Sequence, residues 1–199
     1  MEKMKLYLRD IIEIAIFISI AIVLDKLLKI PFAPTGGSIN LSMVPLLVIA
    51  LRHGPFKAFI AGGIVFGLIT NLLDGYGLNT YPMEYLIAFG ATGILGLFAK
   101  TISNSFENKK DIFLSYIILI LSVALIATIR VLAASVDSVL FYELDWGAAI
   151  LYNVSYVYLS ALFSLIATAI LLPIIGVLNK SFKTAFLNKK RAWALFLFQ

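Results

Sequence analysis

The stretch that decides the fold is "DIFLSYIILILSVALIATIRVLAAS", residues Asp111–Ser135. A helix that crosses a membrane needs roughly 20 mostly apolar residues, because each residue adds about 1.5 Å along the helix axis. This run is long enough, and after its first residue only Arg130 carries a charge. The stretch therefore predicts a membrane-spanning helix, and the rest of the chain can be examined outward from it.

The composition of the whole chain agrees with that prediction. Hydrophobic residues make up 61%, charged residues 14%, and the mean hydropathy is +1.00, whereas soluble domains carry about 25% charged and about 45–50% apolar residues. The absence of cysteine excludes disulfides and cysteine-based metal or redox chemistry. A single histidine, His53, cannot form a multi-histidine metal site. We expect a membrane protein with no metal and no cofactor.

Six apolar segments predict an all-α membrane protein, a six-transmembrane-helix bundle that forms a single integral domain over residues 1–199. The predicted helices are 10–28, 42–51, 55–73, 81–102, 111–135 and 148–178. The second is shorter than a span, so it is tilted, interrupted or extended by its flanks. The first follows "MEKMKLYLRD" and lacks an A-x-A-like cleavage site, which favours a retained helix over a signal peptide.

The basic residues predict the topology, because Lys and Arg mark cytoplasmic loops. Thirteen of the 16 fall on one side of the predicted bundle: Lys3, Lys5, Arg9, Arg52, Lys57, Lys100, Lys109, Lys110, Lys180, Lys183, Lys189, Lys190 and Arg191. This places both termini in the cytoplasm, and the net charge of +5 then indicates membrane topology rather than nucleic-acid binding. The apolar end "AWALFLFQ" is expected at the membrane interface; a cloning remnant and a disordered tail are the alternatives.

Two charged residues inside apolar segments are candidates for function. Glu84 falls in the first turn of segment 81–102, at the predicted outer surface. It either caps that helix or faces a cavity and binds a cationic or hydrogen-bonding ligand. Arg130 is expected at a similar depth, where it either pairs with Glu84 or holds the ligand itself. Asp74 and Asp137, at outer helix ends, are predicted to be solvated.

Aromatic residues gather on the same predicted side: Tyr76, Tyr81, Tyr85, Phe141, Tyr142, Trp146, Tyr152 and Tyr156. An interfacial aromatic belt accounts for some of them. The pairs Glu84–Tyr85 and Tyr152–Asn153, however, place polar beside aromatic groups within apolar segments. Aromatic faces combined with a carboxylate suit a flat, positively charged heteroaromatic ligand.

The sequence carries no signature of catalysis or of energy input, so we expect a protein that is not an enzyme. It has no G-x-x-x-x-G-K-[ST] phosphate loop, and its one histidine lies on the predicted cytoplasmic side, which excludes a Ser-His-Asp triad. Glycines in segments 55–73 and 81–102 favour close packing within the bundle. Ala15 and Ser19, four residues apart, form a small-xxx-small face that suits either the bundle or a partner membrane protein.

Several motifs resemble one known family. The stretches "EIAIFISIAIVLD", "GGSINLSMVPLLVIALRHG", "MEYLIAFGATGILGLF" and "LYNVSY" are similar, in order and over most of the chain, to the thiamine-specific substrate-binding (S) subunits of energy-coupling-factor (ECF) vitamin transporters. The resemblance implies a multi-pass plasma-membrane protein of a prokaryote. It also implies vitamin capture from outside and association with an ECF transmembrane coupling subunit and two cytoplasmic ATPases.

The resemblance also assigns roles to residues. It implies that Glu84 binds the aminopyrimidine of thiamine, that Tyr85 and Asn153 contribute to the site, and that Ala15 and Ser19 dock on the coupling subunit. We further expect Tyr152 and Trp146 to enclose the ligand rings, with the loop "PFAPTGGSIN" as a lid.

Two departures from the family pattern keep other ligands open. The family histidine falls on Ala134, and the tyrosine expected shortly before Asn153 falls near Ala148. A first alternative is therefore an S subunit for another pyrimidine, pyridine or pterin vitamin or precursor. A second alternative is a structural or assembly membrane protein without a small ligand.

Overall fold

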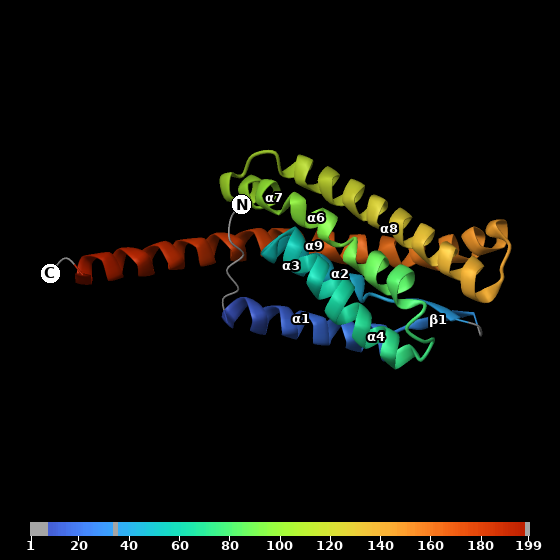
Figure 1. Cartoon of the computed structure of the whole chain (residues 1–199). Helices are drawn as coiled ribbons and strands as arrows, with labels where there is room; N and C mark the ends of the chain where they lie inside the picture. The colour runs from blue at the N-terminus through green and yellow to red at the C-terminus, as the bar shows by residue number, and fades with distance from the viewer. Residues whose placement is uncertain (1–7, 34–35, 198–199) are drawn as a thin grey trace.

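The computed structural model describes residues 8–33 and 36–197; side chains are described except for residues 33, 36, 177 and 179–197. It is a helical bundle with one short β-hairpin (Figure 1). The elements are α1 Leu8–Lys26, β1 Ile30–Ala33, β2 Gly36–Ile39, α2 Met43–His53, α3 Pro55–Phe59, η1 Ile60–Phe66, α4 Gly67–Asp74, η2 Tyr81–Ile87, α5 Ala88–Gly90, α6 Gly93–Leu97, α7 Ala99–Asn108, α8 Ile112–Tyr142 and α9 Trp146–Leu197.

The predicted class, an all-α membrane protein, is confirmed. Three continuous helical stretches are long and apolar enough to cross a membrane: Pro55–Asp74, Ile112–Tyr142 and Trp146–Gly176. Tyr81–Leu97 with Ala99–Asn108, bent by 40°, forms a fourth if the pair is one span. These are the candidates within the described part of the chain. The count of six spans and the cytoplasmic termini stay predictions.

The short second helix, α2, lies at the centre of the bundle. Nine consecutive residues, Met43–Leu51, are buried, and α1, α6 and α9 pack around them. A helix that is apolar on every side is stable only where other helices cover it. It ends at Gly54, which has a φ of +83° and donates a backbone hydrogen bond of 3.0 Å to Ala50. Its shortness therefore reflects a central position.

The two longest helices extend beyond their predicted ends. Helix α8 continues past Ser135 to Tyr142, so most of the predicted outer loop is helical. The prediction that Asp137 is solvated is wrong, because this added turn buries it to 1% exposure. Helix α9 runs through Pro173 to Leu197 and past the bundle (Figure 1). The "AWALFLFQ" segment is helical as far as residue 197, and its last two residues lie outside the described range.

Glycines allow two helical segments to approach closely, as their positions predicted. A Cβ atom on Gly96 of α6 would lie 2.6 Å from the backbone nitrogen of Pro55 at the start of α3. A Cβ on Gly63 of η1 would lie 2.7 Å from the carbonyl oxygen of Leu86 in η2. Real Cβ atoms do not come this close to backbone, so the contact requires glycine. It sets the position of η2, which carries Glu84.

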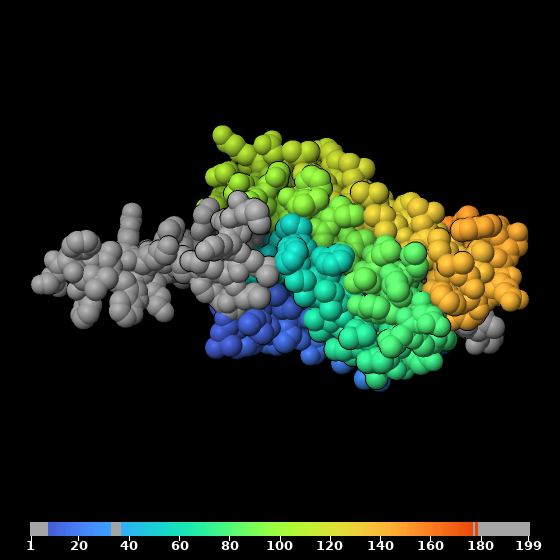
Figure 2. Space-filling view, viewed as in Figure 1, coloured from blue at the N-terminus to red at the C-terminus, as the bar shows by residue number. Residues whose placement is uncertain are grey.

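One end of the bundle gathers segments that are distant in sequence. The β1–β2 hairpin, the end of α4 and the turn between α8 and α9 lie at the end opposite the start of α1 and the C-terminal half of α9 (Figure 1). In the space-filling view the α8–α9 turn, in orange, abuts the green segment of α4 and η2 (Figure 2), and α8 contacts η2. The candidate site lies at this end.

Candidate functional site

A cavity of about 340 Å³ opens at the hairpin end of the bundle, within the range of about 300–1,000 Å³ typical of small-ligand sites. Its lining comes from α1, the hairpin, α4, η2, α5, α8 and α9, and comprises Asp25, Lys29, Pro31, Gly37, Ser38, Asn40, Thr70, Asp74, Tyr76, Glu84, Tyr85, Ala88, Phe89, Arg130, Ala134, Tyr156 and Val157. Three predicted site residues, Glu84, Tyr85 and Arg130, are therefore brought together. Ala134, the position of the family histidine, lines the same space.

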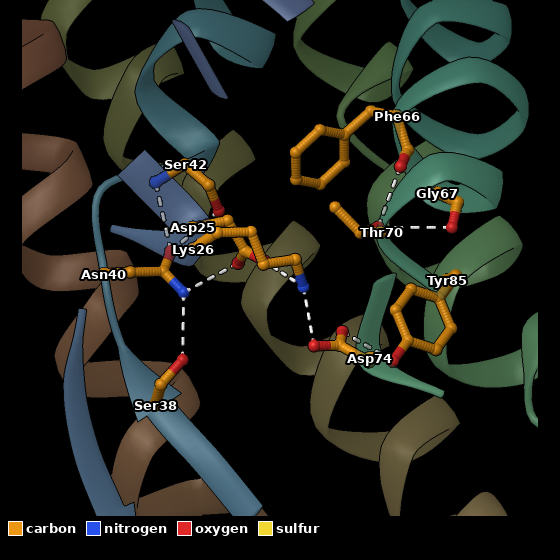
Figure 3. A network of polar contacts seen from close by, with 10 residues as sticks. All are labelled: Asp25, Lys26, Ser38, Asn40, Ser42, Phe66, Gly67, Thr70, Asp74 and Tyr85. Carbon is orange, nitrogen blue, oxygen red and sulfur yellow. Dashed lines mark hydrogen bonds and ion pairs between the residues drawn. The ribbon is translucent and has the colours of Figure 1, made fainter. Parts of the chain in front are cut away.

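A hydrogen-bonded network holds the wall around Tyr85. The Tyr85 hydroxyl donates to Oδ2 of Asp74 at 2.9 Å, and Lys26 Nζ donates to Oδ1 of Asp74 at 2.6 Å (Figure 3). Lys26 also lies 2.8 Å from Asp25. The prediction that Asp74 is solvated is wrong, since it links α1, α4 and η2. Lys26 offsets the charge of both aspartates and so leaves Glu84 outside this ion-pair network.

Tyr76, in the turn between α4 and η2, adds a hydroxyl to the cavity wall. Partial burial, together with the carboxylates of Asp74 and Glu84, raises the pKa of Tyr76 above its usual value. The hydroxyl therefore stays protonated at neutral pH and can donate a hydrogen bond to a ligand.

Arg130 faces the cavity, and none of the described carboxylates forms an ion pair with it. Its guanidinium carbon lies 4.7 Å from the centroid of the Phe89 ring, and Nη1 lies 3.4 Å from the sulfur of Met43. Its Nε is buried without a hydrogen-bond partner. Within the described part of the chain Arg130 forms no ion pair, so the Glu84–Arg130 pair that the sequence left open is absent. Arg130 keeps donors available to a ligand.

Asn153 does not line the cavity but holds a residue that does, Tyr156, by a hydrogen bond. It is 1% exposed, donates to the Ala149 carbonyl at 2.9 Å and to Ser138 Oγ at 3.1 Å, and accepts a 2.8 Å hydrogen bond from the Tyr156 hydroxyl. Asn153 does not line the cavity, whereas Tyr156 does. The sequence drew attention to Tyr156 only as one of several aromatic residues. Its place three residues after Asn153, on the same side of a helix, is the signal that identifies it.

The other two predicted aromatic residues lie away from the cavity lining. Tyr152 packs edge-on against Tyr156, with ring centroids 5.5 Å apart, and against Phe32 of β1 at 6.0 Å. Trp146, at the start of α9, is 54% exposed. Tyr152 therefore supports the wall that Tyr156 forms, and the ligand contact expected of Trp146 stays a prediction.

The segment predicted as an irregular lid contains an antiparallel β-hairpin, in which Pro31 pairs with Ser38. Asn40, just after it, donates to Oδ1 of Asp25 at 3.0 Å and accepts from the Ser42 hydroxyl at 2.7 Å (Figure 3). Gly37, at φ +70°, lies against Tyr152 and Tyr156. The hairpin thus closes one side of the cavity; residues 34 and 35, which follow β1 in the sequence, lie outside the described range.

The predicted docking residues lie on a separate surface. Ala15 and Ser19 are exposed on α1, where Ser19 Oγ donates to the Ala15 carbonyl at 2.9 Å. They line an apolar groove of about 370 Å³ between α1 and the α3–η1–α4 segment. Near the start of α1, Asp10 accepts from Lys57 at 2.6 Å and Glu13 pairs with Arg52. No group of residues suited to a metal ion occurs in the described ranges.

Comparison with solved structures defines the class of protein. The chain matches ThiT from Listeria monocytogenes with a TM-score of 0.63 and 28% identity, covering 90% of this chain and 97% of that one. It also matches FolT bound with folic acid, with a TM-score of 0.62 and 19% identity, over 81% and 91% of the two chains. The fold is that of the S components, which are membrane-embedded transport proteins and not enzymes.

The particular family follows from the sequence. Residues 11–184 match the family described as Thiamine transporter protein (Thia_YuaJ), and the chain belongs to this family. It is 32% identical over 107 residues to the thiamine transporter ThiT of Bacillus subtilis (strain 168), a match that spans 50% of this chain and 53% of that relative. The protein is accordingly a multi-pass protein of the plasma membrane.

Proposed function

We propose that this protein captures thiamine at the outer face of the membrane, with high affinity, and delivers it to an ECF module. The observation that carries the proposal is the cavity in which Glu84, Tyr85 and Arg130 meet, in a chain of the thiamine transporter family. Glu84 binds the aminopyrimidine through charge-assisted hydrogen bonds. Phe89 and Tyr156 offer aromatic faces to the rings, and Arg130 donates to the polar end of the ligand.

The carboxylates of the cavity also suit the permanent positive charge of the thiazolium ring. Asp25 and Asp74 are offset by Lys26, so Glu84 is the carboxylate of the lining that this ion-pair network leaves for the ligand. A cation in a site with little water is attracted to such a carboxylate and to aromatic faces. The β1–β2 hairpin then shields the bound vitamin from solvent.

Ala134 supports a second candidate ligand. It lines the cavity at the position where the family has a histidine, and its side chain offers no hydrogen bond. A vitamin with a different ring system, such as another pyrimidine, a pyridine or a pterin, would not need an imidazole there. This candidate keeps the transport function and changes only the vitamin.

Delivery requires a partner, because the chain has no phosphate-binding loop. We infer that the exposed face of α1 around Ala15 and Ser19 docks on an ECF transmembrane coupling subunit, which two cytoplasmic ATPases drive. Small side chains permit close helix contact in a membrane. The double variant Ala15→Leu/Ser19→Leu should therefore abolish thiamine uptake by cells while leaving thiamine binding by the purified protein unchanged.

The first experiment is a titration of the purified protein with thiamine, followed by tryptophan fluorescence and repeated for Glu84→Gln. The chain has two tryptophans, Trp146 and Trp193, so replacing each by phenylalanine assigns any quenching. Saturable quenching at nanomolar thiamine, lost or strongly weakened in Glu84→Gln, supports the proposal. A response to another vitamin alone selects the second candidate. No response to any vitamin contradicts both.

A further inference from the structure

Asp137 is a buried carboxyl group that the proposed site does not yet use. It lies on α8 and is 1% exposed, and neither of its oxygens receives a hydrogen bond from a nitrogen or hydroxyl group of the described residues. A buried carboxyl group without such partners costs several kcal/mol of folding free energy when charged. Residues that carry this kind of cost concentrate at functional sites.

Its position on α8 directs it toward the cavity. Arg130, Ala134 and Asp137 follow one another at intervals of four and three residues, which places them on one face of the helix. Arg130 and Ala134 both line the cavity. Asp137 itself is not among the lining residues, and Ala134, at the position of the family histidine, lies between it and Arg130 along this face.

The partner of Asp137 is Glu84. Their carboxyl groups lie within hydrogen-bonding reach of each other, one from α8 and the other from η2. Two carboxylates in such contact repel, and the arrangement is stable when the pair shares one proton. Such a pair offers one O–H donor and several acceptor oxygens.

This combination is complementary to one edge of an aminopyrimidine, where a ring nitrogen that accepts adjoins an amino group that donates. We propose that Asp137 is a second ligand-recognition residue, which together with Glu84 reads this acceptor–donor edge of the vitamin. The inference rests on the proposed function and deepens it. An ionised Glu84 alone accepts from the amino group and leaves the ring nitrogen without a donor, whereas the pair with its shared proton satisfies both groups.

Two substitutions at one position test the pair. Asp137→Ala removes the donor and acceptor, whereas Asp137→Asn keeps an amide that can donate to the ring nitrogen while Glu84 accepts from the amino group. We expect Asp137→Ala to weaken thiamine binding about 10- to 100-fold, the effect of one lost hydrogen bond to a charged group. The thiamine affinity of the Asp137→Asn variant should stay within a few-fold of that of the parent protein.

Binding is measured by isothermal titration calorimetry with thiamine and with an analogue in which a CH group replaces the pyrimidine nitrogen next to the amino group. Because this analogue lacks the acceptor that Asp137 contacts, Asp137→Ala should weaken its binding clearly less than that of thiamine. The melting temperature of the empty protein should not fall in Asp137→Ala, since the variant removes one of two buried carboxyl groups whose charges repel each other. Glu143→Gln, an exposed carboxylate in the α8–α9 turn, is the matched control and should leave affinity unchanged.

Other outcomes overturn the inference in distinguishable ways. Parental thiamine affinity in Asp137→Ala, with binding still lost in Glu84→Gln, refutes the role of Asp137 and leaves the proposed function intact. Equal losses for thiamine and the analogue, together with a lower melting temperature, assign Asp137 a structural role instead. A parent protein that does not bind thiamine contradicts the proposed function and the inference together.

Discussion

The hydroxyl of Tyr156 donates a 2.8 Å hydrogen bond to the side-chain oxygen of Asn153, one turn earlier on α9. Asn153 is in turn fixed by hydrogen bonds to Ser138 of α8 and to the Ala149 carbonyl. The side-chain amide of Asn153, which was predicted to bind the ligand, is therefore hydrogen-bonded within the protein. Tyr156 is the residue of the pair that lines the cavity. The α8–α9 contact thereby sets the orientation of one wall of the site.

This relationship predicts that Asn153 and Tyr156 act as a unit. Asn153→Ala and Tyr156→Phe each remove the same hydrogen bond, and each should weaken thiamine binding about tenfold, as expected for one bond of about 1 kcal/mol or slightly more. The double variant should be hardly weaker than Asn153→Ala alone, because coupled residues are not additive. Calorimetric titration of the four proteins measures this coupling. Fully additive losses would mean that Asn153 contacts the ligand independently.

We predict that a side chain at position Gly37 prevents the β1–β2 hairpin from closing tightly over the cavity. Its φ of +70° is unfavourable for other residues, and a Cβ atom there would lie 2.9 Å from the Tyr152 hydroxyl. Gly37→Ala should displace the hairpin from Tyr152 and Tyr156 and increase the thiamine dissociation rate several-fold, as measured by stopped-flow fluorescence. Gly75→Ala is the control, since Gly75 also has a positive φ, of +75°, but nothing lies near its Cβ position. Equal rates in both variants would argue against a lid.

We predict that replacing Arg130 lowers the affinity for thiamine without lowering the thermal stability of the protein. Replacing it with methionine keeps much of the apolar stem over Phe89 but removes the guanidinium. We expect thiamine affinity to fall about 10- to 100-fold, while the melting temperature of the empty protein stays the same or rises, because a buried Nε without a partner is removed. Arg130→Lys should give an intermediate affinity, since it keeps the charge without the planar donors. A marked loss of thermal stability in the methionine variant would indicate a structural cation instead.

We predict that replacing Gly96 lowers the stability of the protein through a steric clash between α6 and α3. Gly96→Ala would place a Cβ atom 2.6 Å from the Pro55 nitrogen, and the backbone on both sides leaves little room to adjust. We expect a destabilisation of about 1–3 kcal/mol, visible as a lower melting temperature in detergent. Gly147→Ala is a suitable comparison, because its nearest neighbour would be the flexible Asp145 side chain at 3.1 Å. Similar melting temperatures for the two variants would contradict the close contact between α3 and α6.

Much of the fold could be predicted because the bilayer imposes it locally. Lipid offers no hydrogen bonds to the backbone, so apolar runs such as Asp111–Ser135 must be helical wherever they stand in the chain. Glu84 and Arg130 could be selected for the same reason, since charges within such runs are costly and tend to be functional. The glycine contacts of Gly63 and Gly96 could be expected from their place in apolar segments.

The predictions that the structure contradicts concern residues whose surroundings depend on contacts between segments distant in sequence. Asp137 and Asp74 stand at predicted helix ends and would be solvated if the neighbouring segments did not cover them. The extension of α8 to Tyr142 buries Asp137, whereas Asp74 stays partly exposed but is held in an ion pair with Lys26. No local pattern carries this information, because it arises from how α1, α4, η2 and α8 meet.

The sequence by itself determined the class of the protein, its helical segments and the charged residues of the site, because hydrophobicity acts on each segment separately. Only the tertiary structure decided that Glu84 contacts Asp137 rather than pairing with Arg130, and that Asn153 holds Tyr156. Those choices follow from side-chain distances of a few ångströms between helices. They are set by packing around α2 and by the glycine contacts that position η2, which the pattern of any single segment does not contain.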